Sequence, residues 1–526
     1  MTVGEPVAAA GDHAVERGRL QADAVGGSFW TSVQVFLGLP VATVANVVVA
    51  HRLGVGAYGT LAIYTLVFGV AATVLNAGMS DATVQWLATH RARREAAAAA
   101  MMIRRCSGFH VLVQAPVFAA LAAFLLRGSG WVAMGVGASA SALLVVVGTS
   151  TVVLSGTAMN ALAAKIALVS TVAGQTVVVG VAAASPTAVS ILVARLALGL
   201  LPALLALALL PPPLRTAVLR PVLPRGLPAG FWPYALRTGA SGVVASLVFG
   251  RPELLVFDAY GRAEQAGVFA LAAGVAALIT APVDALLGPL LPATAGLLAI
   301  SPERAGAALL RGLRTSAMLA GLVLAVGVPV AAPLLPVVYG RAFSGATAPF
   351  VVLAVVSCLG SVNHPVHAFL LAARRTGLLL GVAVASLVVD GVVAAATIPT
   401  LGVTGGVIAT SVAQLGTLVV IARRVGAALQ VPATDQLRAA LFLIPSVTAG
   451  CLALLAGYVV RDGGWAAQAA VGAVVALACV AVGGRALPGI GLDATDVQVI
   501  AGNLPRRCAP VFALAVRSLG LQARRA

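Results

Sequence analysis

Residues 374–424 read RRTGLLLGVAVASLVVDGVVAAATIPTLGVTGGVIATSVAQLGTLVVIARR, and this stretch decides the solvent in which the chain folds. It contains two apolar runs, 377–398 and 403–422, each close to the roughly 20 residues that an α-helix needs to cross a bilayer. A pair of arginines precedes the first run and another pair follows the second. Both pairs lie on the same side of a membrane if the runs cross it and return, so the stretch predicts two spanning helices.

The rest of the chain repeats this alternation of apolar runs and short polar segments. We expect fourteen spans, at 28–50, 59–80, 107–126, 131–155, 163–184, 188–210, 236–257, 265–288, 316–338, 347–371, 377–398, 403–422, 438–460 and 465–484. With the N-terminus inside, 26 of the 33 basic residues fall in inner segments and only five in outer loops. This bias predicts a multi-pass protein of the plasma membrane with both termini in the cytoplasm.

The composition excludes a water-soluble protein of this size. The 526 residues are 60% hydrophobic and only 9% charged, whereas soluble domains carry about 25% charged residues. The net charge of +17 predicts cytoplasmic loops that face anionic lipid headgroups. Nucleic acid is not an expected partner, because no aromatic stacking motif accompanies the basic residues. The inner-loop arginines expected to bind anionic lipid are Arg91, Arg93, Arg94, Arg104 and Arg105.

The predicted fold is an all-α integral membrane protein with two six-helix lobes and two appended helices. Loop, span and basic segment follow in the same order after residues 56–61 and after residues 266–271, about 210 residues apart. Six spans separate these copies, so they predict a parallel repeat, although chance similarity between Ala/Gly-rich helices is the alternative. The predicted segments are a disordered tail 1–25, a lobe 26–212, a linker 213–230, a lobe 231–425, two helices in 436–484, and a tail 485–526 with an amphipathic helix.

Several motifs in the second lobe resemble those of polysaccharide flippases. They are Leu335–Phe343 (LPVVYGRAF), Phe369–Gly377 (FLLAARRTG), Ile398–Thr410 (IPTLGVTGGVIAT) and the entry to the eighth span at Asp258–Ala270. These flippases belong to the multidrug/oligosaccharidyl-lipid/polysaccharide exporter superfamily, and the resemblance covers residues 28–425. It departs from the family at Asp390, where members usually carry Asn, and the first span lacks the arginine pattern of lipid II flippases.

The resemblance implies a flippase that moves a polyprenyl-diphosphate-linked oligosaccharide from the inner to the outer leaflet by alternating access, for cell-surface polysaccharide synthesis. Glycan polymerase or ligase proteins are the further expected partners. The first alternative is a small-molecule exporter of the same fold, coupled to Na⁺ or H⁺. A membrane glycosyltransferase or ligase is disfavoured because the outer loops reach only about eight residues, and a scaffold that recruits partners is a further alternative. No Walker A sequence or metal-ligand spacing occurs, so we expect neither an enzyme nor a cofactor.

Polar side chains inside the spans are the candidate substrate-binding residues, because an ionisable group in the bilayer usually faces a cavity or a partner. Arg251 is the main candidate, since a guanidinium suits diphosphate oxygens. Alternatively, Arg251 reaches the membrane surface or pairs with another span. Pro252 predicts a kink, and the spacing of Arg251 and Glu253 places them on different faces of a helix. The full set is Arg251, Arg195, Glu253, His364, His367, Asn46 and Asn76.

Three carboxylates are candidates for coupling transport to an ion gradient: Asp81, Asp284 and Asp390. Asp284 lies between Pro282 and Pro289, which predict a broken helix of the kind found where protein or water covers the exposed backbone. Its alternative role is to balance an arginine.

Overall fold

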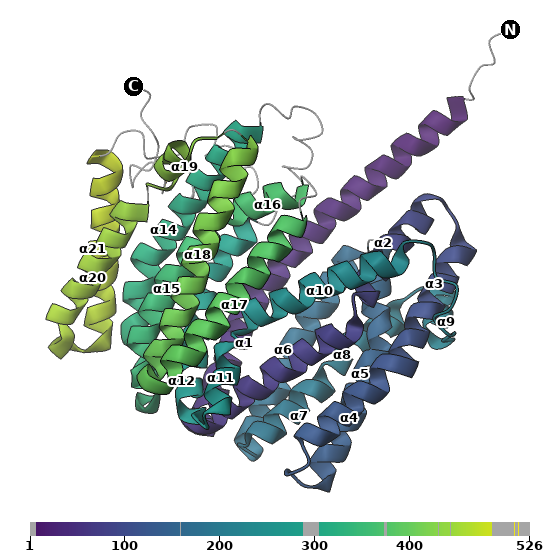
Figure 1. Cartoon of the computed structure of the whole chain (residues 1–526), viewed down its shortest axis with the longest axis horizontal. Helices are drawn as coiled ribbons and strands as arrows, with labels where there is room; N and C mark the ends of the chain where they lie inside the picture. Colours follow the sequence, from purple (N-terminus) through teal and green to yellow (C-terminus); the bar gives the residue numbers. More distant parts are fainter. Residues whose placement is uncertain are drawn as a thin grey trace. The chain divides into compact units, whose positions relative to one another are not determined.

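The computed structural model describes residues 7–157, 159–287, 305–372, 376–429, 431–441 and 443–486, together with Pro510 and Leu514. Every secondary-structure element among these residues is a helix and none is a strand (Figure 1), which confirms the all-α prediction. The amphipathic helix predicted in the tail 485–526 lies outside the described residues, apart from Pro510 and Leu514.

The chain divides into two compact units, Met1–Gly250 and Arg251–Ala526. The described elements of unit 1 are α1 Val7–Asn76, α2 Met79–Ala92, α3 Ala96–Phe109, a π-helix η1 His110–Gln114, α4 Ala115–Leu125, α5 Trp131–Gly156, α6 Asn160–Ala184, α7 Ala188–Leu198, α8 Leu200–Leu209, α9 Pro212–Leu219 and α10 Phe231–Gly250. Those of unit 2 are α11 Glu253–Ala259, α12 Ala263–Leu287, α14 Ala305–Val338, η3 Arg341–Ala346, α15 Thr347–Ser361, α16 His364–Ala372, α17 Thr376–Leu401, α18 Val403–Leu429, α19 Ala433–Ala440, α20 Leu443–Val459, η4 Arg461–Gly463 and α21 Gly464–Ala486.

Helix α1 contains the first predicted span, 28–50, and residues 59–76 of the second, 59–80. Gly54 has φ 72 and ψ 175, which is not helical, so α1 is two helical segments joined at this residue (Figure 1). Glycine suits the position because it has no Cβ to disfavour positive φ. The element begins at Val7, within the stretch 1–25 for which the sequence predicts a disordered tail.

The described residues contain twelve helices long and apolar enough to cross a membrane, or thirteen if the pair on either side of Arg251 counts as one span. The prediction of fourteen differs because residues Phe36–Asn76 count once here, although they include most of two predicted spans, 28–50 and 59–80. At about 1.5 Å per residue, these 41 residues reach about 60 Å, twice the thickness of the hydrocarbon core. The chain is therefore a multi-pass membrane protein.

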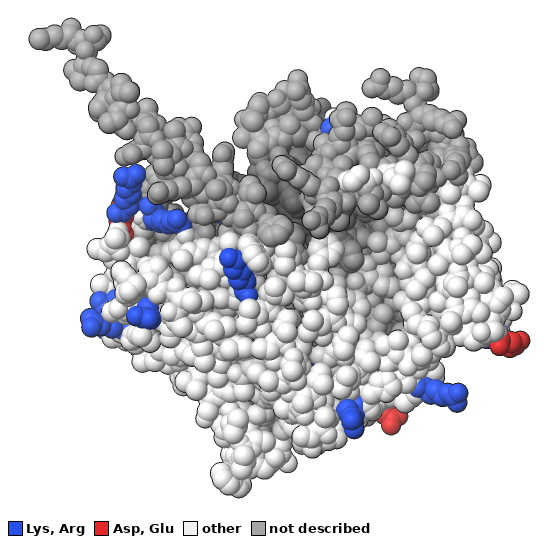
Figure 2. All heavy atoms as spheres, turned by 180° about the vertical axis from the view of Figure 1, so that it is seen from behind, with Lys and Arg blue, Asp and Glu red and all other residues white. Residues whose placement is uncertain are grey.

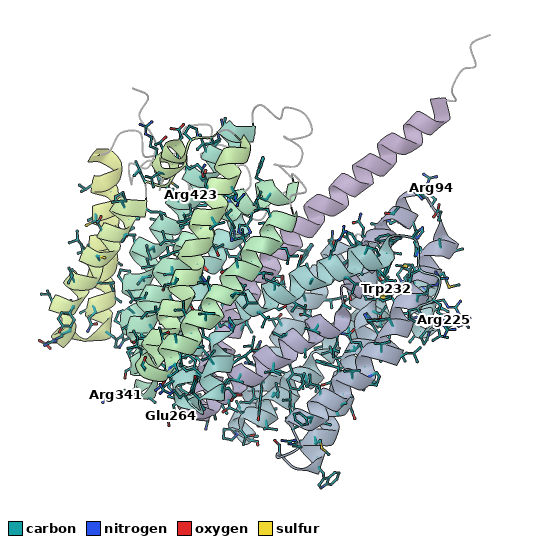
Figure 3. The ribbon with its side chains drawn as sticks, in the orientation of Figure 1. Arg94, Arg225, Trp232, Glu264, Arg341 and Arg423 are labelled. Carbon is teal, nitrogen blue, oxygen red and sulfur yellow. The ribbon has the colours of Figure 1, made fainter. Side chains whose placement is uncertain are left out.

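Charged side chains are few on the surface, as a lipid-facing protein requires. Figure 2 shows one face with broad areas that carry no Lys, Arg, Asp or Glu. Within unit 2, Glu264 and Arg341 lie at one end of the helices and Arg423 lies at the other (Figure 3). These are the opposite ends that the predicted alternation of outer and inner loops requires.

The start of α10 packs into unit 1 through an aromatic cluster. Phe231 is fully buried, and its ring centroid lies 5.3 Å from that of Trp86 on α2. Tyr234 lies 5.5 Å from the same indole. Aromatic pairs at this separation stabilise packing by about 0.5–1.5 kcal/mol beyond burial. The boundary between the compact units therefore follows α10, whereas the sequence places the start of the second lobe at residue 231; the lobe boundaries as functional units stay a prediction.

Residues 218–226, which we call the strap, are bound to α3. Four hydrogen bonds join them: Arg104 Nε to the Arg220 carbonyl at 3.0 Å, Arg105 Nη1 to the Gly226 carbonyl at 2.5 Å, Ser107 Oγ to the Val218 carbonyl at 2.7 Å, and Val222 N to the Arg104 carbonyl at 3.0 Å. The guanidinium groups of Arg104 and Arg105, expected to bind anionic lipid, thus hold part of the predicted linker. Gly108 permits this contact, because a Cβ there would overlap the Val222 carbonyl.

Replacing Gly108 with valine is expected to release the strap. Overpacking of this kind costs typically about 1–3 kcal/mol, so the population of molecules in which the strap is detached from α3 should rise about tenfold. Trypsin cleavage after Arg225, followed by mass spectrometry on the detergent-purified protein, measures this opening. Gly135→Val is the matched control, because a Cβ at Gly135 meets open space. Equal cleavage rates in the two variants would contradict the role assigned to Gly108.

Candidate functional site

The helix that would form the seventh span is interrupted at Arg251 and Pro252. Helix α10 ends at Gly250 and α11 begins at Glu253, which confirms the predicted interruption at Pro252. Arg251 has φ 66, a left-handed conformation that is uncommon for residues other than glycine. The expectation that Arg251 and Glu253 occupy different helix faces is therefore wrong, because no continuous helix connects them.

Glu253 is completely buried at the start of α11. One carboxylate oxygen, Oε1, accepts a hydrogen bond from the Thr410 hydroxyl on α18. The other oxygen, Oε2, is buried and has no hydrogen-bond donor among the described residues. A buried carboxylate is costly unless it is paired, so this oxygen requires a proton or a cation.

Asp390 on α17 lies beside Glu253 and is only 7% exposed. Its Oδ1 also lacks a donor among the described residues. The two carboxyl groups are close enough to interact electrostatically. Two ionised carboxylates at close range repel each other, so the pair favours the uptake of a proton or a cation.

The Arg251 guanidinium completes the cluster. It interacts electrostatically with the carboxyl groups of both Glu253 and Asp390. With the Gln414 amide oriented to satisfy its neighbours, the amide oxygen accepts from Arg251 Nη1 at 3.2 Å and the nitrogen donates to the Val356 carbonyl at 3.3 Å. Arg251 is partly exposed, so its guanidinium is held by the cluster without being sealed inside it.

Glycines within residues 374–424 bring the three helices of this site, α11, α17 and α18, together. Gly402, with φ 59, makes the turn between α17 and α18. A Cβ on Gly405 would overlap the backbone of Thr397, so its absence lets α18 approach α17 closely. A Cβ on Gly406 would lie 3.2 Å from the Phe257 ring of α11. The glycine pattern therefore positions Thr410, one turn beyond Gly406, against Glu253.

Thr410 and Gln414 are site residues that the sequence did not single out. Thr410 ends the motif Ile398–Thr410, and Gln414 follows it by four residues on the same helix face. A polar pair at this spacing within an apolar span was the signal available.

Two predicted substrate residues of unit 1 belong to a different polar group. Asn46 Nδ2 donates to the Tyr58 hydroxyl at 3.0 Å, and the Arg195 guanidinium interacts electrostatically with the same tyrosine. Asn76 bonds only locally, with its Nδ2 donating to Ser80 Oγ at 2.7 Å. Sequence spacing gives no sign that Asn46, Tyr58 and Arg195 meet.

The remaining predicted residues lie elsewhere. His364 and His367 interact with each other on α16, and Asp81 is exposed in the first turn of α2. Asp284 lies in α12, but its side chain is outside the described part of the structure. The expected break does not occur at Pro282, because α12 continues past it to Leu287. Pro289, the other proline of the expected break, lies outside the described residues.

The cluster of Arg251, Glu253, Asp390, Thr410 and Gln414 can carry out two chemical tasks. The paired carboxyl oxygens can take up and release one proton or a small monovalent cation. The guanidinium can bind an anion, and its attraction to that anion depends on the charge of the carboxyl pair. Among the described residues, no group of three or more His, Cys, Asp or Glu side chains could hold a metal ion.

Comparison with known proteins shows the family to which the chain belongs. The model of a family described as "Polysaccharide biosynthesis protein" matches residues 48–348, more than half of the chain. No curated protein matches the sequence.

Solved structures share the fold at low sequence identity. The inward-facing conformation of a multidrug resistance MATE family transporter of the MOP superfamily is 16% identical, with a TM-score of 0.59, 76% of this chain covered and 99% of that one. The lipid II flippase MurJ in its inward closed conformation is 13% identical, with a TM-score of 0.60, 88% of this chain covered and 99% of that one. At these identities the likeness establishes the fold alone, which this chain shares with both proteins.

Proposed function

Because this chain belongs to the polysaccharide biosynthesis protein family, we propose that it is a flippase for a polyprenyl-diphosphate-linked oligosaccharide. It carries the diphosphate headgroup from the inner to the outer leaflet by alternating access, while the lipid tail stays in the bilayer. We place it in the plasma membrane with both termini in the cytoplasm, as the arginine distribution predicts.

The observation that carries this proposal is the charged cluster within an apolar helical unit. Arginine is the side chain best suited to diphosphate, because its planar guanidinium can donate two parallel hydrogen bonds to phosphate oxygens. The cluster also provides a mechanism for coupling transport to an ion gradient. When the carboxyl pair is charged it competes with the diphosphate for Arg251, and when the pair takes up a proton or cation it leaves the guanidinium to the substrate.

The orientation of lipid-linked glycan in a deletion strain tests the proposal. Without the gene, the lipid-linked oligosaccharide should accumulate on the inner leaflet, protected from a membrane-impermeant glycosidase or lectin added outside. The wild-type gene should restore its exposure. Normal exposure in the deletion strain, with no second flippase gene present, would overturn the proposal.

A small-molecule exporter coupled to Na⁺ or H⁺ is the second candidate, because a carboxyl pair that takes up a cation would serve it equally well. The same strain separates the two. If glycan exposure is unchanged while resistance to cationic drugs falls, the exporter function replaces the flippase function.

Glycan polymerase or ligase proteins are the partners that a flippase would supply with substrate. We therefore expect them near the outer loops of this chain in the membrane. Crosslinking in intact cells followed by mass spectrometry would detect them, and their absence from all crosslinked products would remove this part of the proposal.

A further inference from the structure

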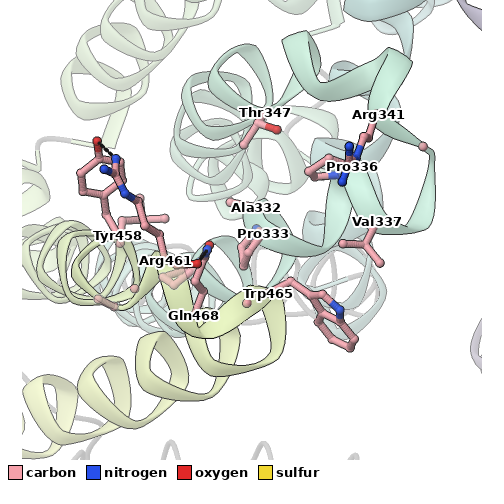
Figure 4. Close-up of a pocket in the computed structure, with 16 residues that line it drawn as sticks. Ala332, Pro333, Pro336, Val337, Arg341, Thr347, Tyr458, Arg461, Trp465 and Gln468 are labelled. Carbon is pink, nitrogen blue, oxygen red and sulfur yellow. Dashed lines mark hydrogen bonds between the residues drawn. The ribbon is translucent and has the colours of Figure 1, made fainter.

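A second candidate binding site lies in unit 2, apart from the charged cluster. A pocket of about 790 Å³ opens between α14, α20 and α21, at the end of these helices where η3 and η4 begin (Figure 4). This volume is within the range of about 300–1,000 Å³ typical of small-molecule sites. None of the residues predicted to bind substrate or ions lines it.

One wall of the pocket is apolar and stiff. Pro329, Pro333 and Pro336 all lie within α14 and all line the pocket. Their spacing of four and three residues places them on a single helix face. The facing wall comes from α20 and includes Ala453, Leu454 and Gly457, which are apolar, whereas Thr347 and Gln468 supply polar groups elsewhere in the lining. Such walls suit a hydrocarbon chain.

Two arginines stand on opposite sides of the pocket (Figure 4). Arg461 is fixed in place, because its Nη1 donates to the Tyr458 hydroxyl at 2.6 Å and its guanidinium lies 4.9 Å from the centre of that ring. Gln468 Nε2 also donates to the Arg461 carbonyl, at 3.1 Å. Arg341 has no hydrogen bond or ion pair with any described residue.

The charge of the pocket is uncompensated. Its lining residues include these two arginines and no Asp or Glu. Asp462 lies 3.9 Å from Arg461 Nε, but its side chain is 98% exposed and it does not line the pocket. An exposed pair of this kind contributes little. The pocket therefore offers two guanidinium groups to an anion.

Aromatic residues mark the mouth of the pocket as a membrane-surface position. Trp465 and Tyr458 line it and are 47% and 64% exposed. Tryptophan and tyrosine are enriched where lipid headgroups meet hydrocarbon. A ligand in the pocket would thus have its anionic group at headgroup level and its apolar part along the helices.

We propose that this pocket binds one anionic phospholipid from the adjacent leaflet. The phosphate binds at the Arg341 guanidinium, Arg461 adds positive charge on the other side of the pocket, and an acyl chain follows the proline face of α14. A free phosphate ion would leave the apolar wall uncovered, which is why the ligand is a lipid. The site is independent of glycan flipping and would exist in an exporter of the same fold.

Native mass spectrometry tests the site on the full-length protein in micelles containing equal amounts of phosphatidylglycerol and phosphatidylcholine. The wild type should retain one phosphatidylglycerol preferentially. Arg341→Gln combined with Arg461→Gln should lower that retention about tenfold or more, because charge-assisted hydrogen bonds are lost while side-chain length is kept. The control is Arg52→Gln with Arg127→Gln, which removes two exposed arginines that do not line the pocket.

Three results would overturn the proposal. The first is equal retention of the two lipids by the wild type. The second is an equal loss of phosphatidylglycerol in the pocket variant and the control variant, which would indicate a general effect of charge. The third is a retained mass that matches a polyprenyl diphosphate from the host membrane, lost in the pocket variant, since the ligand would then be the transported lipid. Each single variant, Arg341→Gln and Arg461→Gln, keeps the test decisive if the double variant does not fold.

Discussion

Replacing Arg251 with alanine is expected to lower export of the lipid-linked glycan about 100-fold. If Arg251 donates charge-assisted hydrogen bonds to the diphosphate, their loss removes about 3 kcal/mol of stabilisation, and each 1.36 kcal/mol is a factor of ten in rate. Arg251→Lys keeps the charge and should retain partial activity, because lysine lacks the planar fork. The measurement is the rate at which lipid-linked glycan becomes accessible outside the cell in the complemented deletion strain.

A structural role for Arg251 must be separated from a role in binding. Its guanidinium balances two buried carboxyl groups, so Arg251→Ala alone could act through folding. Arg251→Ala combined with Asp390→Asn removes one carboxylate as well and restores the charge balance. If the double variant accumulates normally but, unlike Asp390→Asn alone, gains no protection from substrate against thermal unfolding, Arg251 binds substrate; protection equal to that of Asp390→Asn would show that Arg251 only balances charge. Arg237→Ala, an exposed arginine on α10, is the control.

Neutralising the carboxyl pair is expected to uncouple transport from the ion gradient. Asp390→Asn or Glu253→Gln should lower gradient-driven transport about tenfold or more, while substrate binding is kept. The reason is that an amide cannot exchange a proton and is a weaker cation ligand than a carboxylate. Proteoliposomes with imposed H⁺ or Na⁺ gradients measure the driven rate, and substrate protection against thermal unfolding measures binding.

Asp258→Asn is the matched control for this experiment, because Asp258 is an exposed carboxylate on the same short helix as Glu253. It should respond to the gradients as the wild type does. Gradient-driven rates that are unchanged in Asp390→Asn and Glu253→Gln would refute the coupling role of the pair. Asp81 and Asp284, the other predicted coupling carboxylates, would then be the remaining candidates for the coupling role.

The candidate site could be predicted from the sequence only in part. Arg251, Glu253 and Asp390 were identifiable because ionisable residues inside apolar runs are rare and costly. The pairing of Arg251 with Glu253 could not be predicted, because it depends on a break in the helix at Arg251. The φ of 66 at that break cannot be inferred from the residue type. Thr410 is 157 residues from the Glu253 carboxylate to which it donates, and its type is ordinary in a span.

The sequence by itself determined the solvent, the helical class, most of the spans and the alternation of their ends. These follow from the length of apolar runs and the position of arginines, which are local properties that no partner helix changes. The tertiary structure decided which helices meet. It placed α10 with unit 1 through Phe231 and Trp86, held the strap on α3, and brought α11, α17 and α18 together around the carboxyl pair. The physical reason is that lipid is as apolar as most of these side chains, so hydropathy does not select a neighbour; close packing at glycine and pairing of buried polar groups do.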